Sequence, residues 1–223
     1  MNQSSEPLDL PVSHLYRPSA LKNNAPLLVL LHGYGSNMHD LFGFAPYLNK
    51  DFAVVALQAP IHLGGQSYAW YDIFFDQPQG KWSDETQARE SVELIQEVLK
   101  KIVQQVAVAA DKLNLLGFSQ GAILSYAAAM SHGHLSKVAG LSGYLNEDIL
   151  PEKSTLNSCP NTQFFISHGA QDQVIPIDWA RATKQRLLRL GCSLEYHEFP
   201  SGHGVSPDNF AALNAFLNQD HLG

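Results

Sequence analysis

The sequence predicts an α/β protein in which helices cover both faces of a mostly parallel central sheet. Short apolar runs, such as LLVLL and FAVVAL, alternate along the chain with longer segments whose apolar residues recur every three or four positions. Nearly continuous apolar runs are typical of parallel strands that are buried on both faces. Longer segments with one apolar stripe are typical of the helices that cover such a sheet.

The expected strands follow from the apolar runs in chain order. The run LEYHEF at residues 194–199 is more polar than the others, so we expect this strand nearer an edge of the sheet. The runs that are apolar enough for strands buried on both faces lie at residues 27–31, 52–57, 113–116, 138–141 and 164–167.

The longest expected helix spans residues 84–106, where apolar residues at three- and four-residue steps form one stripe. Ser83 is its expected N-cap, because a serine side chain can accept a bond from the first free N–H groups. Gly191 and the pair Ser206-Pro207 mark a helix end and a helix start respectively. The remaining helices are expected at residues 38–48, 120–131, 178–190 and 207–218.

Composition and charge are those of a single globular domain over residues 1–223. The chain is 45% hydrophobic and 16% charged, with a formal net charge of −7 and no run of basic residues. Nothing therefore indicates a nucleic-acid partner or an anionic membrane surface. No apolar stretch approaches the ~20 residues that cross a bilayer, and the N-terminus lacks a secretory signal pattern. We expect a cytoplasmic protein without stable membrane insertion; a homodimer remains an open alternative to a monomer.

The two cysteines of the chain, Cys159 and Cys192, match neither a metal-ligand nor a redox spacing. A cytoplasmic location keeps most thiols reduced. We therefore expect two reduced cysteines, with one disulfide as the alternative.

The motif Gly117-Phe118-Ser119-Gln120-Gly121 has the G-x-S-x-G pattern of a nucleophilic serine turn. The pattern alone is common, but here an expected strand leads directly into it and an expected helix leads directly out. That strand–turn–helix setting holds such a serine on a strained backbone and exposes its hydroxyl group. We interpret Ser119 as a catalytic nucleophile.

A serine hydroxyl needs a nearby base, and the base needs an orienting carboxylate. His203 lies in a Gly-rich loop between the last expected strand and the last expected helix, and Asp172 follows the strand at 164–167. The order Ser119, Asp172, His203 is the chain order of the α/β-hydrolase triad. Asp178 is the alternative carboxylate, although its position favours a helix-capping role.

Two backbone N–H groups are expected to stabilise the oxyanion that forms during attack on a carbonyl group. One is that of Gln120, directly after the nucleophile, and the other is that of Tyr34, in the HGYG loop after the first buried strand. His32, which begins this loop, is expected to have a structural role.

These motifs together resemble the phospholipase/carboxylesterase family, which includes the acyl-protein thioesterases. The resemblance covers about residues 26–217 and is carried by LHGYGSN, AWYDI, GFSQGA, HGAQDQVIP and SGHGV. It implies an α/β-hydrolase fold, the triad and oxyanion residues named above, and cleavage of small ester or thioester substrates without a metal or organic cofactor. Long-chain thioesterases of the family usually have HGLGD where this chain has HGYGS, so the resemblance is closer to carboxylesterases.

The segment at residues 70–82 is rich in aromatic residues and has neither helical nor strand periodicity. We interpret it as a substrate flap in which Trp70, Phe74, Phe75 and Trp82 bind an acyl group, although some of them could instead fill the core.

The expected function is hydrolysis of carboxylic esters with short to medium acyl chains through an acyl-enzyme. The alternatives are a long-chain acyl-protein thioesterase or lysophospholipase, and a non-catalytic binding protein on a hydrolase scaffold.

Overall fold

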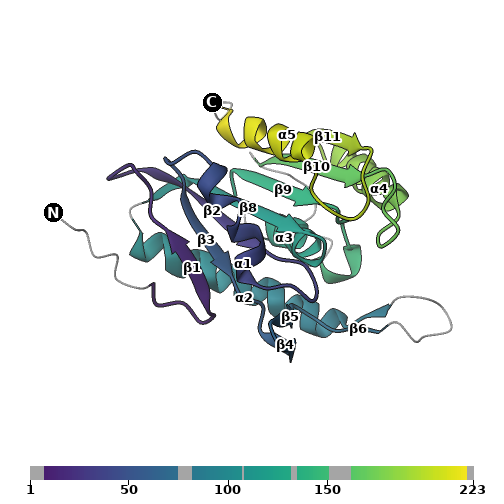
Figure 1. Cartoon of the computed structure of the whole chain (residues 1–223), viewed down its shortest axis with the longest axis horizontal. Helices are drawn as coiled ribbons and strands as arrows, with labels where there is room; N and C mark the ends of the chain where they lie inside the picture. Colours follow the sequence, from purple (N-terminus) through teal and green to yellow (C-terminus); the bar gives the residue numbers. More distant parts are fainter. Residues whose placement is uncertain (1–7, 75–81, 107, 132–134, 151–161, 220–223) are drawn as a thin grey trace.

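The computed structural model describes residues 8–74, 82–106, 108–131, 135–150 and 162–219, and its centre is a seven-stranded sheet. The strand order is β1-β3-β2-β8-β9-β10-β11 (Figure 1). Only the pairing of β1 with β3 is antiparallel in this sheet. The strands are β1 (His14–Arg17), β2 (Ala25–Leu31), β3 (Ala53–Leu57), β8 (Val108–Phe118), β9 (Lys137–Leu141), β10 (Gln163–Gly169) and β11 (Ser193–Phe199).

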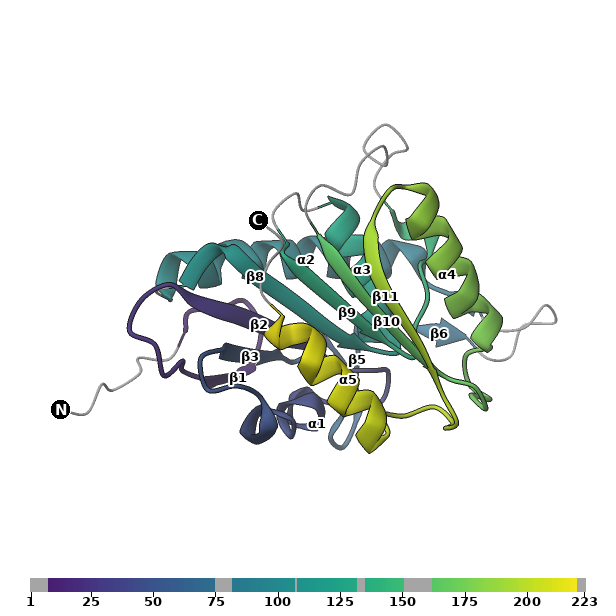
Figure 2. The ribbon, with the colours of Figure 1, turned by 90° about the horizontal axis from the view of Figure 1, so that it is seen from above.

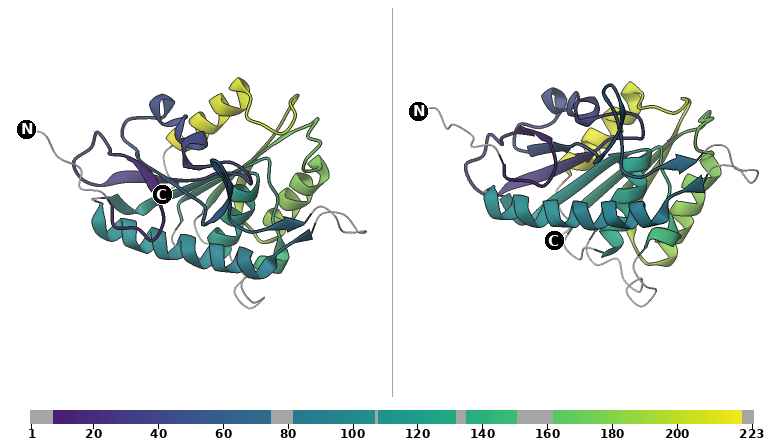
Figure 3. Two further views of the ribbon diagram at one scale, coloured as in Figure 1. Left: turned by 60° about the horizontal axis from the view of Figure 1, so that its bottom comes forward. Right: turned by 90° about the horizontal axis from the view of Figure 1, so that it is seen from below.

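Helices cover both faces of the sheet, as predicted (Figures 2 and 3). One face carries α2 (Glu85–Gln105), α3 (Gln120–Ser131) and α4 (Ile177–Arg189). The opposite face carries α1 (Met38–Phe42), the 3₁₀ helix η1 (Ala45–Tyr47) and α5 (Pro207–Asn218). A further 3₁₀ turn, η2, spans Glu147–Ile149. Among the helices that the structure describes, none combines the length and apolarity that a membrane span requires.

The alternation of side chains along β2 shows how the core divides between the two faces. Leu27, Val29 and Leu31 point to the layer of α2 and α3, whereas Leu28 and Leu30 point to the layer of α1 and α5. All of these side chains are buried. A strand that buries both faces needs apolar residues at successive positions, which explains why the run LLVLL is continuous.

Two short antiparallel ribbons lie outside the main sheet in the described part of the chain. The first pairs β4 (Ile61–Gly64) with β5 (Ser67–Ala69), and the second pairs β6 (Ile73–Phe74) with β7 (Trp82–Ser83). The second ribbon pairs the two sides of the segment predicted to be a substrate flap. Residues 75–81 of that segment lie outside the described residues.

The structure corrects two helix predictions. Asp84, not Ser83, caps α2, because its side chain accepts the hydrogen bond from the Gln87 N–H group. The helix expected at 38–48 divides into α1 and η1, since Pro46 has no N–H group with which to continue an α-helical ladder.

Cys192, after the end of α4, is disulfide-bonded. The expectation of reduced cysteines is therefore wrong for this residue. Cys159, the other cysteine in the sequence, lies outside the described residues. A disulfide requires two Cα atoms within about 7 Å, and that separation depends on the folding of distant segments rather than on sequence spacing.

Candidate active site

Ser119 stands between the end of β8 and the start of α3, in the sharp turn that the motif predicted. Its φ angle is 53°, in the left-handed region that non-glycine residues rarely occupy. A Cβ atom at Gly117 would lie 2.2 Å from the Gly121 carbonyl oxygen, and one at Gly121 would lie 2.0 Å from that of Leu31. Both flanking positions therefore require glycine, because backbone atoms occupy the space that any other side chain would fill.

His203 connects Ser119 to Asp172 through hydrogen bonds on both ring nitrogens. The Ser119 Oγ atom lies 3.0 Å from His203 Nε2, and His203 Nδ1 lies 2.7 Å from Asp172 Oδ2. Because the ionised carboxylate can only accept, Nδ1 carries the proton and Nε2 is free to accept the serine proton. The structure thus brings the three predicted triad residues together. The alternative carboxylate, Asp178, is exposed and pairs with Arg181 instead.

Backbone contacts hold the two loops that carry Asp172 and His203 against each other. The Gln171 N–H group donates to the Ser201 carbonyl oxygen over 2.9 Å. A Cβ atom at Gly169 would lie 2.2 Å from the carbonyl oxygen of Gly202, so the loops touch without an intervening side chain. These contacts fix the distance between the carboxylate and the imidazole.

Asp172 is held in its ionised form despite burial of its side chain. Burial opposes ionisation, but hydrogen bonds from the Ile175 N–H group, from His203 and from the Val174 N–H group outweigh it. The pKa of Asp172 is consequently below its usual value. The main-chain donors lie 2.8 and 2.9 Å from Asp172 Oδ1, which leaves Oδ2 to face the imidazole.

Both predicted oxyanion residues belong to segments that adjoin Ser119. Gln120 is the first residue of α3, so its main-chain N–H group has no acceptor within the helix. Its side-chain amide accepts from the Trp70 N–H group and donates to the Tyr71 carbonyl oxygen. Tyr34 follows Gly33, whose Cβ position would lie 3.3 Å from that of Ser119. The HGYG loop therefore packs directly on the nucleophile turn.

His32 has the structural environment that the sequence predicted. The ring is buried; Nδ1 donates to the Gly33 carbonyl oxygen over 2.8 Å, and Nε2 accepts from the Ala59 N–H group over 3.1 Å. Burial is the main cause of a pKa below the usual histidine value. The neutral ring thus connects the HGYG loop to the segment after β3.

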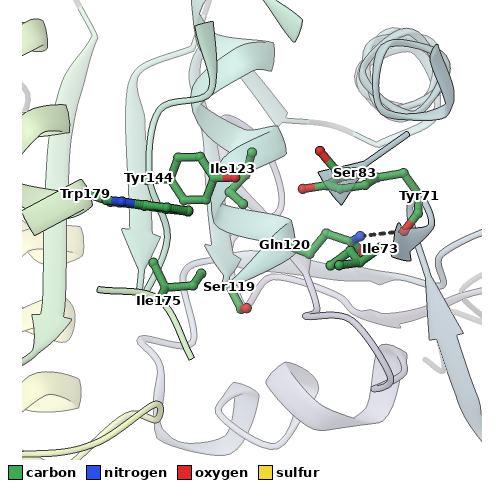
Figure 4. A pocket seen from close by; sticks show the side chains of 9 residues that line it. All are labelled: Tyr71, Ile73, Ser83, Ser119, Gln120, Ile123, Tyr144, Ile175 and Trp179. Carbon is green, nitrogen blue, oxygen red and sulfur yellow. Dashed lines mark hydrogen bonds between the residues drawn. The ribbon is translucent and has the colours of Figure 1, made fainter. Parts of the chain in front are cut away.

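A small pocket opens beside Ser119 (Figure 4). Tyr144, Ile175 and Trp179 lie on one side of the nucleophile, and Tyr71, Ile73 and Ser83 lie on the other. The rings of Tyr144 and Trp179 meet edge to face, with centroids 4.6 Å apart. The cavity volume is about 60 Å³. The full lining in the described part of the chain is Tyr71, Ile73, Ser83, Ser119, Gln120, Ile123, Tyr144, Ile175 and Trp179.

The structure places the residues predicted to bind an acyl group in different environments. Trp70 is buried in the core, where its indole N–H donates to the His32 carbonyl oxygen, and it does not line this pocket. Phe74 is exposed on β6, next to the lining residue Ile73. Trp82 belongs to β7 and pairs with Phe74, whereas Phe75 lies outside the described residues.

Sequence reasoning missed most of the pocket wall. Tyr144 follows the carboxyl end of β9, and Ile175 and Trp179 follow that of β10. Parallel strands present their carboxyl ends at one edge of the sheet, where ligands usually bind. Apolar and aromatic residues just after these strands were therefore a usable signal.

The described residues contain no group of three or more histidine, cysteine or acidic side chains that could hold a metal ion.

A strained serine turn after a central parallel strand, with an aspartate and a histidine from later loops, defines an α/β-hydrolase. The chain belongs to the phospholipase/carboxylesterase family, whose model matches residues 18–221. This match confirms the family, the fold and the ester-hydrolase class predicted from the sequence.

Individual relatives support this assignment. Acyl-protein thioesterase 1 of Debaryomyces hansenii is 28% identical over 158 residues, which cover 67% of this chain and 66% of the relative. Acyl-protein thioesterase 1 homolog 1 of Dictyostelium discoideum is 30% identical over 156 residues, which cover 68% and 67%. Each of these matches thus spans about two thirds of the relative. The crystal structure of a carboxylesterase from Mesorhizobium loti has the same fold, with a TM-score of 0.81, 21% identity and coverage of 96% and 99%.

Proposed function

We propose that this chain hydrolyses carboxylic esters with short to medium acyl chains through an acyl-enzyme on Ser119. The observation that carries the proposal is the hydrogen-bonded chain from Ser119 Oγ through His203 to the ionised Asp172, located at a small apolar pocket. A nucleophile, its base and the group that orients the base are the parts that acyl transfer requires.

In the first half of the reaction, His203 Nε2 accepts the Ser119 proton while the serine oxygen attacks the ester carbonyl carbon. Asp172 stabilises the imidazolium that forms, because its carboxylate faces Nδ1 at 2.7 Å. The main-chain N–H groups of Gln120 and Tyr34 stabilise the oxyanion, and each such donor typically contributes about 3 kcal/mol. The alcohol then leaves with the proton held by His203.

In the second half, water attacks the acyl-enzyme with His203 again acting as the base. The collapse of the second tetrahedral intermediate releases the carboxylic acid and returns the proton to Ser119. Both halves use the same donors and the same base, so a single geometry serves the whole cycle.

The size and the lining of the pocket support the proposal of short to medium acyl chains. The cavity beside Ser119 is small, with a volume of about 60 Å³, which favours short to medium acyl groups over long ones. Its aromatic and aliphatic lining favours an uncharged acyl group. The competing candidate is activity on long acyl chains, which the relatives named acyl-protein thioesterase 1 favour.

The test is hydrolysis of p-nitrophenyl esters from acetate to palmitate by the wild type, Ser119→Ala and Ser83→Ala. Ser83→Ala is the matched control, because Ser83 lines the same pocket but makes no hydrogen bond with His203. Activity on short and medium chains that Ser119→Ala abolishes and Ser83→Ala retains supports the proposal. Efficient cleavage of palmitate favours the thioesterase or lysophospholipase alternative. Folded wild-type protein without activity on any ester favours the non-catalytic alternative.

A further inference from the structure

A second histidine contacts the carboxylate of Asp172. The Nε2 atom of His168, near the end of β10, lies 3.3 Å from Asp172 Oδ2, the oxygen that also accepts from His203 Nδ1. Both the His168 and the Asp172 side chains are 0% exposed, whereas that of His203 is 18% exposed. The buried carboxylate thus lies between two imidazoles, and the proposed mechanism uses only one of them.

The surroundings of His168 define which nitrogen carries its proton. Nε2 lies 2.9 Å from the Ile175 carbonyl oxygen, which can only accept a hydrogen bond. The proton on Nε2 therefore points to this carbonyl oxygen, and Asp172 Oδ2 lies beside the same N–H group at 3.3 Å. Nδ1 is buried and has no hydrogen-bond partner among the described residues. In the part of the chain that the structure describes, the polar contacts of His168 are therefore made by its Nε2–H group.

Ile175 connects His168 and Asp172 into one closed turn. Its N–H group donates to Asp172 Oδ1, and its carbonyl oxygen accepts from His168. Rotation of the Asp172 carboxylate would break the bonds from Val174 and Ile175 on Oδ1 and the contacts of both histidines on Oδ2. The Ile175 residue also lines the substrate pocket, so the same turn places the carboxylate and one pocket wall.

We propose that His168 is a positioning residue that fixes the Asp172 carboxylate toward His203 through its Nε2–H group, an inference that rests on the proposed triad function. Without this donor, the turn at residues 172–175 loses the bond to its carbonyl oxygen, and Oδ2 loses one of its two contacts. The carboxylate then orients the base less precisely. Small errors in the placement of reacting groups lower the rate of the chemical step more than they lower substrate binding.

The test compares His168→Leu with His168→Gln in steady-state hydrolysis of a p-nitrophenyl ester that the wild type cleaves well. Leucine removes the donor and keeps most of the volume, whereas the glutamine amide can donate near the position of Nε2. Because Nδ1 makes no hydrogen bond within the described residues, glutamine needs to replace the Nε2–H donor alone. We expect His168→Leu to lower kcat on the order of 10- to 100-fold with little change in KM. His168→Gln should recover kcat to within about fivefold of the wild type.

A double-mutant cycle with Asp172→Asn separates positioning from general packing. If His168 acts through the carboxylate, His168→Leu should lower kcat less than about twofold in the Asp172→Asn background. The proposal would be overturned if the two substitutions lowered kcat multiplicatively. It would also be overturned if the glutamine and leucine variants were equally impaired, or if His168→Leu kept full activity. Thermal unfolding checks each variant, and His168→Asn, whose shorter amide does not reach Asp172, replaces the leucine variant if that protein does not fold. Residual turnover by Ser119→Ala would refute the proposed function instead.

Discussion

Trp179 forms part of the pocket wall, and we predict that Trp179→Ala shifts the enzyme toward longer acyl chains. Its ring packs edge to face on Tyr144 with centroids 4.6 Å apart, and the pair borders a cavity of about 60 Å³. Removal of the indole opens this side of the cavity. We then expect longer acyl groups to bury additional methylene groups beside Ser119.

The magnitude follows from the area that a longer chain can bury. Each buried methylene contributes about 0.8 kcal/mol, which corresponds to about a fourfold change in kcat/KM. Two additional methylenes, from butyrate to hexanoate, would therefore contribute about 15-fold if they were fully buried. Trp179 is 43% exposed, so the vacated space remains partly open to water. We expect the hexanoate-to-butyrate ratio of kcat/KM to increase by about 4- to 15-fold over the wild-type ratio.

The assay is the p-nitrophenyl ester series, with Leu188→Ala as the control. Leu188 lies on the same helix and is 47% exposed, but it does not line the pocket. An unchanged ratio in folded Trp179→Ala, or an equal shift in Leu188→Ala, would refute the assignment of Trp179 to the acyl wall.

Two further predictions concern stability. Gly121→Ala should destabilise the fold by more than about 3 kcal/mol in chemical denaturation, because its Cβ atom would lie 2.0 Å from the Leu31 carbonyl oxygen. Gly204→Ala, with open space at its Cβ position, should change stability by less than about 0.5 kcal/mol, and equal effects would contradict this interpretation. The Arg181 hydrogen bond lowers the pKa of Glu198 to about 2, so the resulting stabilisation is complete above the ordinary value of 4.5 and is lost between pH 4.5 and 2. Glu198→Gln should therefore reduce the loss of stability across that interval by about 0.2 to 1 kcal/mol, as for other exposed pairs, and an acid-unfolding curve identical to the wild type would contradict it.

The sequence predicted the buried strands because each is encoded by a local apolar run. It did not predict β1, whose residues are only partly buried at the antiparallel edge of the sheet. The ribbons β4–β5 and β6–β7 were also missed, since their short strands have little apolar periodicity. The polar run at 194–199 was correctly placed at an edge, as β11.

For the candidate site, residues near sequence motifs could be predicted better than the pocket wall. Ser119 and its neighbours have a local signature, and the position of Asp172 and His203 follows from the order of strands and loops. The contact of Tyr144 with Trp179 instead depends on how α4 packs against the segment after β9. The hydrogen bond of His168 to Ile175 likewise depends on the exact path of a turn, which residue spacing does not encode.

Hydrogen bonds connect the base of the β6–β7 ribbon to the rest of the protein. The Asp72 N–H group donates to the Gln87 side chain of α2, and the Asp84 N–H group donates to the Asp72 carbonyl oxygen over 3.0 Å. Gln120 secures the preceding residues, Trp70 and Tyr71. Because these hydrogen bonds lie at the base of the ribbon, insertions or deletions farther along it need not alter the proton-transfer geometry. Selection, natural or in the laboratory, can therefore diversify the substrates that the protein accepts and leave its proton-transfer residues unchanged.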